Sequence, residues 1–170
     1  AAEFGIVKGG QKLAGLLVFI SDVHSIGLRL AQGLQLTEAF YWDLNDRTRG
    51  WTGRVRPLLS QGAVPNSMQA GNYAATLHFL KTVKELGPEK AKHAGRITVA
   101  AMKQMPTEDD CFGKGLIRVD GRKIHPSQLF RVKQAGAIRE PGAIFDLVAT
   151  TPAEEAFRPL SEGGCKLVQG

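Results

Sequence analysis

Residues 15–20 (GLLVFI) run directly into the polar segment 21–25 (SDVHS). Six uncharged residues, rich in large aliphatic side chains, predict a strand that is buried on both faces, as in a parallel sheet covered by helices. In open α/β sheets, ligands bind beyond the carboxyl ends of the strands. Asp22 and His24 would therefore lie where a ligand binds. Asp22 could instead cap the helix that follows, and the local sequence leaves both roles open.

The composition is that of a folded chain. It has 170 residues, of which 43% are hydrophobic and 22% are charged, and this length is enough for one ordinary domain with its own core. No apolar run approaches the roughly 20 residues that a membrane span needs. Residues 1–10 lack the basic start and the apolar centre of a signal peptide. A mature or trimmed chain has the same appearance, so the compartment stays open at this point.

The net charge is +6, and the isoelectric point is about 9.6. A basic chain raises the possibility of nucleic-acid binding, but that function needs the basic residues to cluster. The densest group is interrupted by Trp51 and flanked by acidic residues; it consists of Arg47, Arg49, Arg54 and Arg56. The pattern indicates a solvated helix face, and we expect no nucleic-acid partner.

The sequence lacks the residue patterns typical of metal sites and of covalent catalysis. Cys111 and Cys165 lack the paired spacing of a metal site, and they could form one disulfide or remain two separate thiols. The four histidines are not paired: they are His24, His78, His93 and His125. Neither a nucleophile elbow nor a phosphate-binding loop is present. We therefore expect no catalytic residues, no metal and no cofactor.

Local patterns predict an alternation of helices and strands. Residues 67–86 form the clearest helix, and Tyr73 lies on its apolar stripe with Leu77, Leu80, Val83 and Leu86. An Asp-Gly pair at 120–121 predicts a hairpin between 116–119 and 122–125. Further strands are predicted at 34–37, 128–132 and 143–150, further helices at 26–33, 43–60, 89–105 and 152–157, and the end of a helix at 1–5.

A non-catalytic binding pocket suits these residues better than an active site. Such a pocket needs a carboxylate for an ammonium group, a few polar partners and aromatic walls. Asp22 supplies the carboxylate, and Tyr73, Tyr41 and Trp42 could supply the walls. Tyr73 could equally pack in the core, and Tyr41 and Trp42 could cover a seam between a helix and a sheet.

With these motifs in view, the chain resembles the C-terminal half of a periplasmic substrate-binding protein of the branched-chain amino-acid (Leu/Ile/Val) ABC transporter family. The matching segments follow the family's order along nearly the whole chain: they are 2–6, 16–27 (LLVFISDVHSIG), 36–43 (LTEAFYWD), 69–80 (QAGNYAATLHFL), 105–110, 115–125 and 148–165 (VATTPAEEAFRPLSEGGC). The stretches 134–142 and 53–57 depart from the family's pattern.

The resemblance implies an α/β fold with parts of two Rossmann-like three-layer lobes of a type I periplasmic binding protein, incomplete in this chain. Residues 1–36 would belong to the second lobe, 37–131 to the first lobe, and 132–170 to the second lobe and the C-terminal tail. The remainder of both lobes would precede residue 1. Exposed apolar faces would then pack against that missing half or against a second copy.

The resemblance also implies the site. Asp22 falls where the family places an acid for the ligand's α-ammonium group, and Tyr73 falls near an aromatic residue that contacts the ligand from the other lobe. Ser21, His24 and Tyr41 are neighbours that the resemblance also carries into the ligand site. Cys165 resembles a family cysteine whose partner would lie in the missing half.

The expected function is therefore solute binding in the periplasm for an ABC importer, without catalysis. The partners would be a branched-chain amino acid or a related small acid or amide, and a membrane permease. Two alternatives remain: a ligand-sensing domain of the same fold coupled to a receptor or regulator, and an α/β enzyme using Asp22 and His24 as an acid–base pair.

Overall fold

The computed structural model describes residues 4–6, 9–60 and 62–168. The chain divides into two compact units, the first made of 1–67 with 127–151 and the second of 68–126 with 152–170, so that it passes three times from one unit to the other. This division differs from the predicted lobe boundaries, because the strand at 35–38 and the strand at 127–132 pair within one unit. The lobe assignment stays a prediction.

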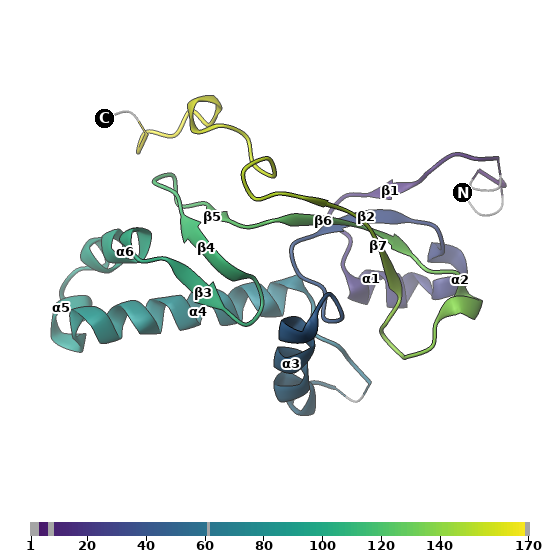
Figure 1. Ribbon diagram of the computed structural model, residues 1–170, viewed down its shortest axis with the longest axis horizontal. Helices are drawn as coiled ribbons and strands as arrows, with labels where there is room; N and C mark the ends of the chain where they lie inside the picture. The colour runs from purple at the N-terminus through teal and green to yellow at the C-terminus, as the bar shows by residue number, and fades with distance from the viewer. Residues whose placement is uncertain (1–3, 7–8, 61, 169–170) are drawn as a thin grey trace. The chain divides into compact units, whose positions relative to one another are not determined.

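The first unit contains a four-stranded sheet in the order β1-β2-β6-β7 (Figure 1). β1 (Ala14–Gly15) pairs with β2 in parallel, whereas the other two pairings are antiparallel. The remaining strands are β2 (Gln35–Glu38), β6 (Ser127–Val132) and β7 (Phe145–Thr151). The strands predicted at 34–37, 128–132 and 143–150 are thus confirmed to within two residues.

The predicted strand at residues 15–20 is wrong. Only Ala14 and Gly15 pair with β2, and a helix, α1 (Ile20–Ile26), already begins at the last residue of the apolar run. Leu17 has a φ of +55°, which interrupts an extended chain. Among the described residues, β1 has a neighbour on one side only. A strand buried on both faces needs elements packed over each face, whereas Leu16 and Leu17 are 90% and 89% exposed.

Helix α2 (Leu28–Ala31) follows α1 after Gly27, whose φ of +89° is the left-handed conformation that glycine tolerates. The helix predicted at 26–33 is therefore present but shorter. None of the helices in the described ranges combines the length and the apolar character that crossing a membrane requires.

Aromatic rings form the core of the first unit. Tyr41 lies 5.1 Å from both Phe130 and Phe145, measured between ring centroids, and Phe40 meets Trp51 edge-on at 5.3 Å. All five residues are at least 95% buried. These rings join the segment after β2 to β6, β7 and the next helix.

That next helix, α3 (Asp46–Val55), continues into a short 3₁₀ turn, η1 (Arg56–Leu58). Asn45 is the N-cap, because its side chain accepts a hydrogen bond from Thr48 N at 3.1 Å while Thr48 Oγ1 accepts one from Asn45 N at 3.1 Å. The helix predicted at 43–60 is therefore present but shorter.

The second unit is built on α4 (Ser67–Leu86), whose bounds agree with the sequence prediction. Its fully buried face differs from the predicted stripe: the buried residues recur every four positions and are Ala70, Ala74, His78 and Thr82. Leu80 is 55% exposed. Because each residue turns a helix by about 100°, a shift of one position rotates the buried face by more than a quarter turn.

The single helix predicted at 89–105 is two helices, α5 (Pro88–His93) and α6 (Gly95–Gln104). They separate at Ala94, which is extended with φ −154° and ψ 123°. Thr98 reaches back across this break, and its hydroxyl donates to Ala91 O at 2.9 Å. Glycine at 95 weakens helix continuity, and this hydrogen bond holds the two short helices together.

A three-stranded antiparallel sheet completes the second unit: β3 (Thr107–Asp109), β4 (Gly113–Ile117) and β5 (Lys123–Ile124). The predicted Asp-Gly turn is confirmed, with Gly121 at φ +87°. The helix predicted at 152–157 is wrong; that stretch forms turns, and the next regular element is η3 (Leu160–Glu162). The predicted helix end at 1–5 lies mostly outside the described residues, and Phe4 and Gly5 form a turn.

Candidate functional site

Asp22 lies in the first turn of α1, where its Oδ2 atom accepts a hydrogen bond from Phe19 N at 2.8 Å. The capping role that the sequence left open is therefore present. The other carboxylate oxygen, Oδ1, accepts no hydrogen bond from the described part of the chain. Capping uses one oxygen and leaves the other for a ligand, so the two roles are compatible.

Ser21 and His24 are exposed on the same short helix. They are three residues apart and share a helix face, whereas Asp22 points away from both, since each residue turns the helix by about 100°. The Ser21 carbonyl accepts a hydrogen bond from Ser25 Oγ at 3.0 Å. The structure thus brings the three residues onto one helix but not onto one face.

Tyr41 lies in the aromatic core of the first unit and is 5% exposed. Its hydroxyl donates to Gly142 O at 3.3 Å and accepts from Phe145 N at 3.3 Å. Burial raises the pKa of this phenol above its ordinary value, so the hydroxyl stays protonated and able to donate further into alkaline solution than an exposed tyrosine does. The described contacts of Tyr41 are these two hydrogen bonds and ring packing within the first unit, and its role in ligand binding stays a prediction.

Tyr73 belongs to α4 in the second unit, where it is half-buried. Its hydroxyl donates to Asp110 Oδ2 at 2.7 Å. Asp110, which the sequence reasoning did not select, fixes the direction of this phenol. Within that unit, Tyr73 is therefore an oriented polar group, not only part of an apolar stripe.

Glu38 is a buried acid that the sequence reasoning missed. It is the last residue of β2, is 6% exposed, and accepts a hydrogen bond from the Ser67 hydroxyl. Burial raises its pKa to about 7; the Ser67 hydrogen bond opposes the shift, and the charge of Asp22 adds to it. The alternation of β2 was the available signal, because Glu38 follows the buried Leu36 by two residues and shares its face.

Gln128 lies directly opposite Glu38 in the register of β2 and β6. It is also 6% exposed, and its Oε1 atom is buried without a hydrogen-bond partner among the described residues. The first unit therefore carries a buried carboxylate opposite an amide oxygen that receives no hydrogen bond from the described residues. The negative charge of Asp22, on α1, contributes to the raised pKa of this carboxyl group.

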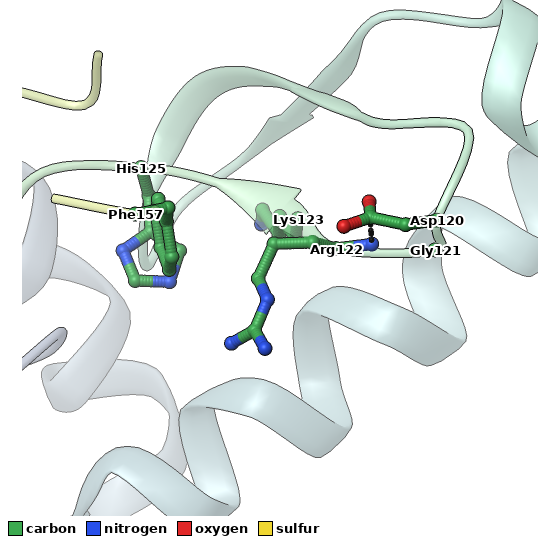
Figure 2. Close-up of a pocket in the computed structure, with 6 residues that line it drawn as sticks. All are labelled: Asp120, Gly121, Arg122, Lys123, His125 and Phe157. Carbon is green, nitrogen blue, oxygen red and sulfur yellow. Dashed lines mark hydrogen bonds between the residues drawn. The ribbon is translucent and has the colours of Figure 1, made fainter. Parts of the chain in front are cut away.

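A separate pocket of about 440 Å³ lies on the second unit, lined by Asp120, Gly121, Arg122, Lys123, His125 and Phe157 (Figure 2). Figure 2 shows the Arg122 and His125 side chains extending to the same side of the strand. The Arg122 guanidinium lies 5.4 Å from the centre of the Phe157 ring. None of the residues predicted to bind ligand lines this pocket.

The other charged groups of this pocket are already paired. Asp120 accepts from Arg118 at 2.6 Å, which holds the pKa of its carboxyl below the usual range. Lys123 lies 2.5 Å from Asp109, whose side chain is 3% exposed. The group left to meet a ligand is a guanidinium, so the pocket suits an anion rather than an ammonium group.

The described residues contain no cluster of three or more His, Cys, Asp or Glu side chains that could hold a metal ion. Cys111 is buried and Cys165 is half-buried, and no disulfide joins them in the described part of the chain.

Taken together, the fold and these residues define a class: two-unit α/β proteins whose chain passes repeatedly between the units. The chain belongs to the periplasmic binding protein family, whose sequence profile matches residues 1–137. This finding confirms the resemblance and the α/β fold class expected from the sequence. No curated protein sequence matches the chain.

Solved structures agree with the family. A periplasmic binding protein from Burkholderia mallei is 38% identical over 98% of this chain, with a TM-score of 0.84. A branched-chain amino acid ABC transporter periplasmic ligand-binding protein from Burkholderia xenovorans LB400 is 35% identical over 98% of it, with a TM-score of 0.84. A leucine-, isoleucine-, valine-, threonine- and alanine-binding protein from Brucella ovis shares the fold at 16% identity and a TM-score of 0.70. The chain spans 42% and 43% of the two Burkholderia proteins.

Proposed function

We propose that this chain is part of a periplasmic solute-binding protein of an ABC importer, and that the protein holds a branched-chain or related amino acid between two lobes. Family membership carries the proposal, together with 35% identity to a Burkholderia xenovorans protein described as a branched-chain amino acid ligand-binding protein. The protein would work in the periplasm, binding without catalysis and delivering its solute to a membrane permease.

Asp22 is the proposed partner of the ligand's ammonium group. Its Oδ2 atom is fixed by the hydrogen bond from Phe19 N at 2.8 Å, which orients the carboxylate and leaves Oδ1 open. A charge-assisted hydrogen bond from an ammonium group to such a carboxylate is short and strong. Ser21, His24, Tyr41 and Tyr73 remain proposed further contacts, and the lobes remain proposed as residues 1–36 with 132–170 and residues 37–131.

The exposed pair Leu16 and Leu17 supports a further contact surface. With 90% and 89% of these residues exposed, they present apolar area at the edge of the sheet. A further part of the protein or a second copy of the chain would bury this area, which is favourable by about 25 cal/mol per Å².

Calorimetry on the full-length protein tests the role of Asp22. Asp22→Asn keeps an oxygen for the Phe19 amide but removes the charge, so binding of L-leucine, L-isoleucine or L-valine should weaken by about 2–5 kcal/mol. Asp46→Asn is the matched control, because Asp46 lies in the first turn of another helix with a fully exposed side chain. Equal affinities for the wild type and Asp22→Asn would refute the role of Asp22.

The enzyme alternative finds little support in the helix geometry. Asp22 and His24 are two residues apart on α1, and side chains at that spacing do not face each other. An acid–base pair would need them to converge on one reacting group. A sensor domain of the same fold stays compatible with every contact described above, and a gene neighbourhood with permease and ATPase genes would favour transport over sensing.

A further inference from the structure

The pocket of Figure 2 adjoins a second hollow of about 430 Å³, and the two share Asp120, Arg122 and Phe157. His125 lines the first hollow, whereas Arg158 lines the second. All five residues belong to the second unit. Sites for small organic molecules usually measure about 300–1,000 Å³, so each hollow is large enough for a ligand. We call the two hollows together the Arg122 groove.

Two segments that lie far apart along the chain build the Arg122 groove: the hairpin of β4 and β5, and the turns that follow β7. Arg118, from the hairpin, donates through Nη1 to the carbonyl oxygen of Arg158 at 3.0 Å. The His125 ring meets the Phe157 ring edge-on, with 5.2 Å between their centroids. These contacts fix the walls of the groove before a ligand arrives, which lowers the entropy cost of binding.

The groove carries two arginines whose charge is available to a ligand. The Arg122 guanidinium lies 5.4 Å from the centre of the Phe157 ring, and neither Arg122 nor the exposed Arg158 forms an ion pair within the described part of the chain. The acid of the groove, Asp120, is neutralised, because its Oδ1 and Oδ2 atoms accept from Nε and Nη2 of Arg118 at 3.2 and 2.6 Å. The groove therefore presents a surplus of positive charge.

These features select a ligand with negative charge and an organic body. A guanidinium presents parallel N–H groups that match two oxygens of a carboxylate or a phosphate. Inorganic phosphate is a compact ion and would leave most of each hollow unfilled. A single carboxylate would pair with only one of the two arginines. An organic molecule with a carboxylate at each end fills the groove and meets both Arg122 and Arg158.

We propose that the Arg122 groove binds a small organic dicarboxylate, at a site separate from the amino-acid site. One carboxylate accepts two hydrogen bonds from the Arg122 guanidinium, which the Phe157 ring holds in position. The other carboxylate pairs with Arg158, and the carbon chain between the two contacts Phe157. Asp22 belongs to the first unit, so this site does not depend on the role proposed for Asp22.

Titration calorimetry on the full-length protein with malonate, succinate and glutarate tests the inference, at an ionic strength of about 0.15 M, where distant surface charges are screened. None of these acids has an ammonium group, so none is a ligand for the carboxylate of Asp22. We expect at least one of the three to bind the wild type with a Kd below about 1 mM. Inorganic phosphate is the comparison ligand and should bind at least about tenfold more weakly than the best dicarboxylate, because it meets one arginine only.

Arg122→Gln keeps an N–H donor but removes the charge, and the exposure of this side chain means that the fold does not depend on it. We expect this variant to bind the dicarboxylate about ten- to a hundredfold more weakly. Phe157→Leu keeps an apolar side chain but removes the ring beside the guanidinium, and it should bind about two- to fivefold more weakly. The matched control is Arg96→Gln, which should leave the affinity unchanged, because Arg96 is an exposed residue of α6 in the same unit and lines neither hollow.

Binding of L-leucine, L-isoleucine and L-valine is measured on the same samples, which separates the two proposals. The inference is overturned if no dicarboxylate binds with a Kd below about 1 mM, or if phosphate binds within about tenfold of the best dicarboxylate. It is also overturned if Arg96→Gln weakens binding as much as Arg122→Gln does. If a dicarboxylate binds as expected but none of the amino acids does, the inference stands and the proposed function fails.

Discussion

Trp42 donates its indole N–H to the carbonyl oxygen of Gly142 at 2.8 Å, although the two residues are 100 positions apart. Gly142 has a φ of +90°, and its carbonyl also accepts the Tyr41 hydroxyl. This single carbonyl therefore joins the segment after β2 to the loop before β7. Such a junction depends on a backbone conformation that only glycine adopts readily.

Gly142→Ala should destabilise the protein by about 2 kcal/mol or more, because a side chain is strained at this φ and its Cβ would lie 2.9 Å from Cγ1 of Val64. Thermal and urea unfolding measure the change. Gly50→Ala is the control: Gly50 lies within α3 and its Cβ would meet nothing within 4 Å. The control should stabilise the protein by about 0.5–1 kcal/mol. If Gly142→Ala leaves the free energy of unfolding unchanged, the claim that this junction requires glycine is wrong.

Tyr41→Phe should lower the free energy of unfolding by about 1 kcal/mol, since it removes two long hydrogen bonds of 3.3 Å but keeps the ring contacts. Tyr41→Ala should cost about 3–5 kcal/mol through the loss of the buried ring. Urea unfolding compares the two variants. An equal loss for both would mean that the hydroxyl, not the ring, carries the stability of this cluster.

Glu38→Gln should stabilise the protein in alkaline but not in acidic solution. The folded-state pKa of about 7 lies above the ordinary value of 4.5 for a glutamic acid, so the folded state binds the proton more tightly than the unfolded state does. Below pH 4.5 the carboxyl group of Glu38 is protonated in both states and does not oppose folding. As the pH rises to 7, the free energy of unfolding falls by about 3 kcal/mol, because the buried carboxylate is less stable than the exposed one. Unfolding of both proteins at pH 5 and pH 8 should show the advantage of Glu38→Gln growing with pH, and a constant difference would contradict the burial argument.

Lys123→Met should destabilise by about 2–3 kcal/mol, because it leaves the carboxylate of Asp109 buried without its cation. Asp109 is held at 2.5 Å by Lys123 and also accepts from Cys111 N and Phe112 N at 2.9 and 2.6 Å. The matched control is Arg131→Met, since the Arg131–Asp146 pair is 3.6 Å long and half exposed on both sides. That control should change the free energy of unfolding by less than about 1 kcal/mol. Equal losses in the two variants would mean that the buried Lys123–Asp109 pair stabilises the protein no more than the exposed Arg131–Asp146 pair does.

Local signals predicted those features that depend on neighbouring residues. The helix at 67–86 and the Asp-Gly turn were correct because helical periodicity and positive φ are properties of short segments. The strand at 15–20 was wrong because pairing partners, which lie far along the chain, decide whether an apolar run becomes a strand. The buried face of α4 was misplaced by one position for a similar reason, since the packing of neighbouring elements selects it.

The sequence by itself determined the family and the fold class, because ordered motifs along nearly the whole chain carry both. The tertiary structure alone decided that Glu38 lies buried opposite Gln128 with Ser67 on its carboxylate. Burial and cross-strand register arise only when segments distant along the chain meet. Register decides which side chains lie beside the carboxyl group, and burial raises its pKa and so its protonated fraction.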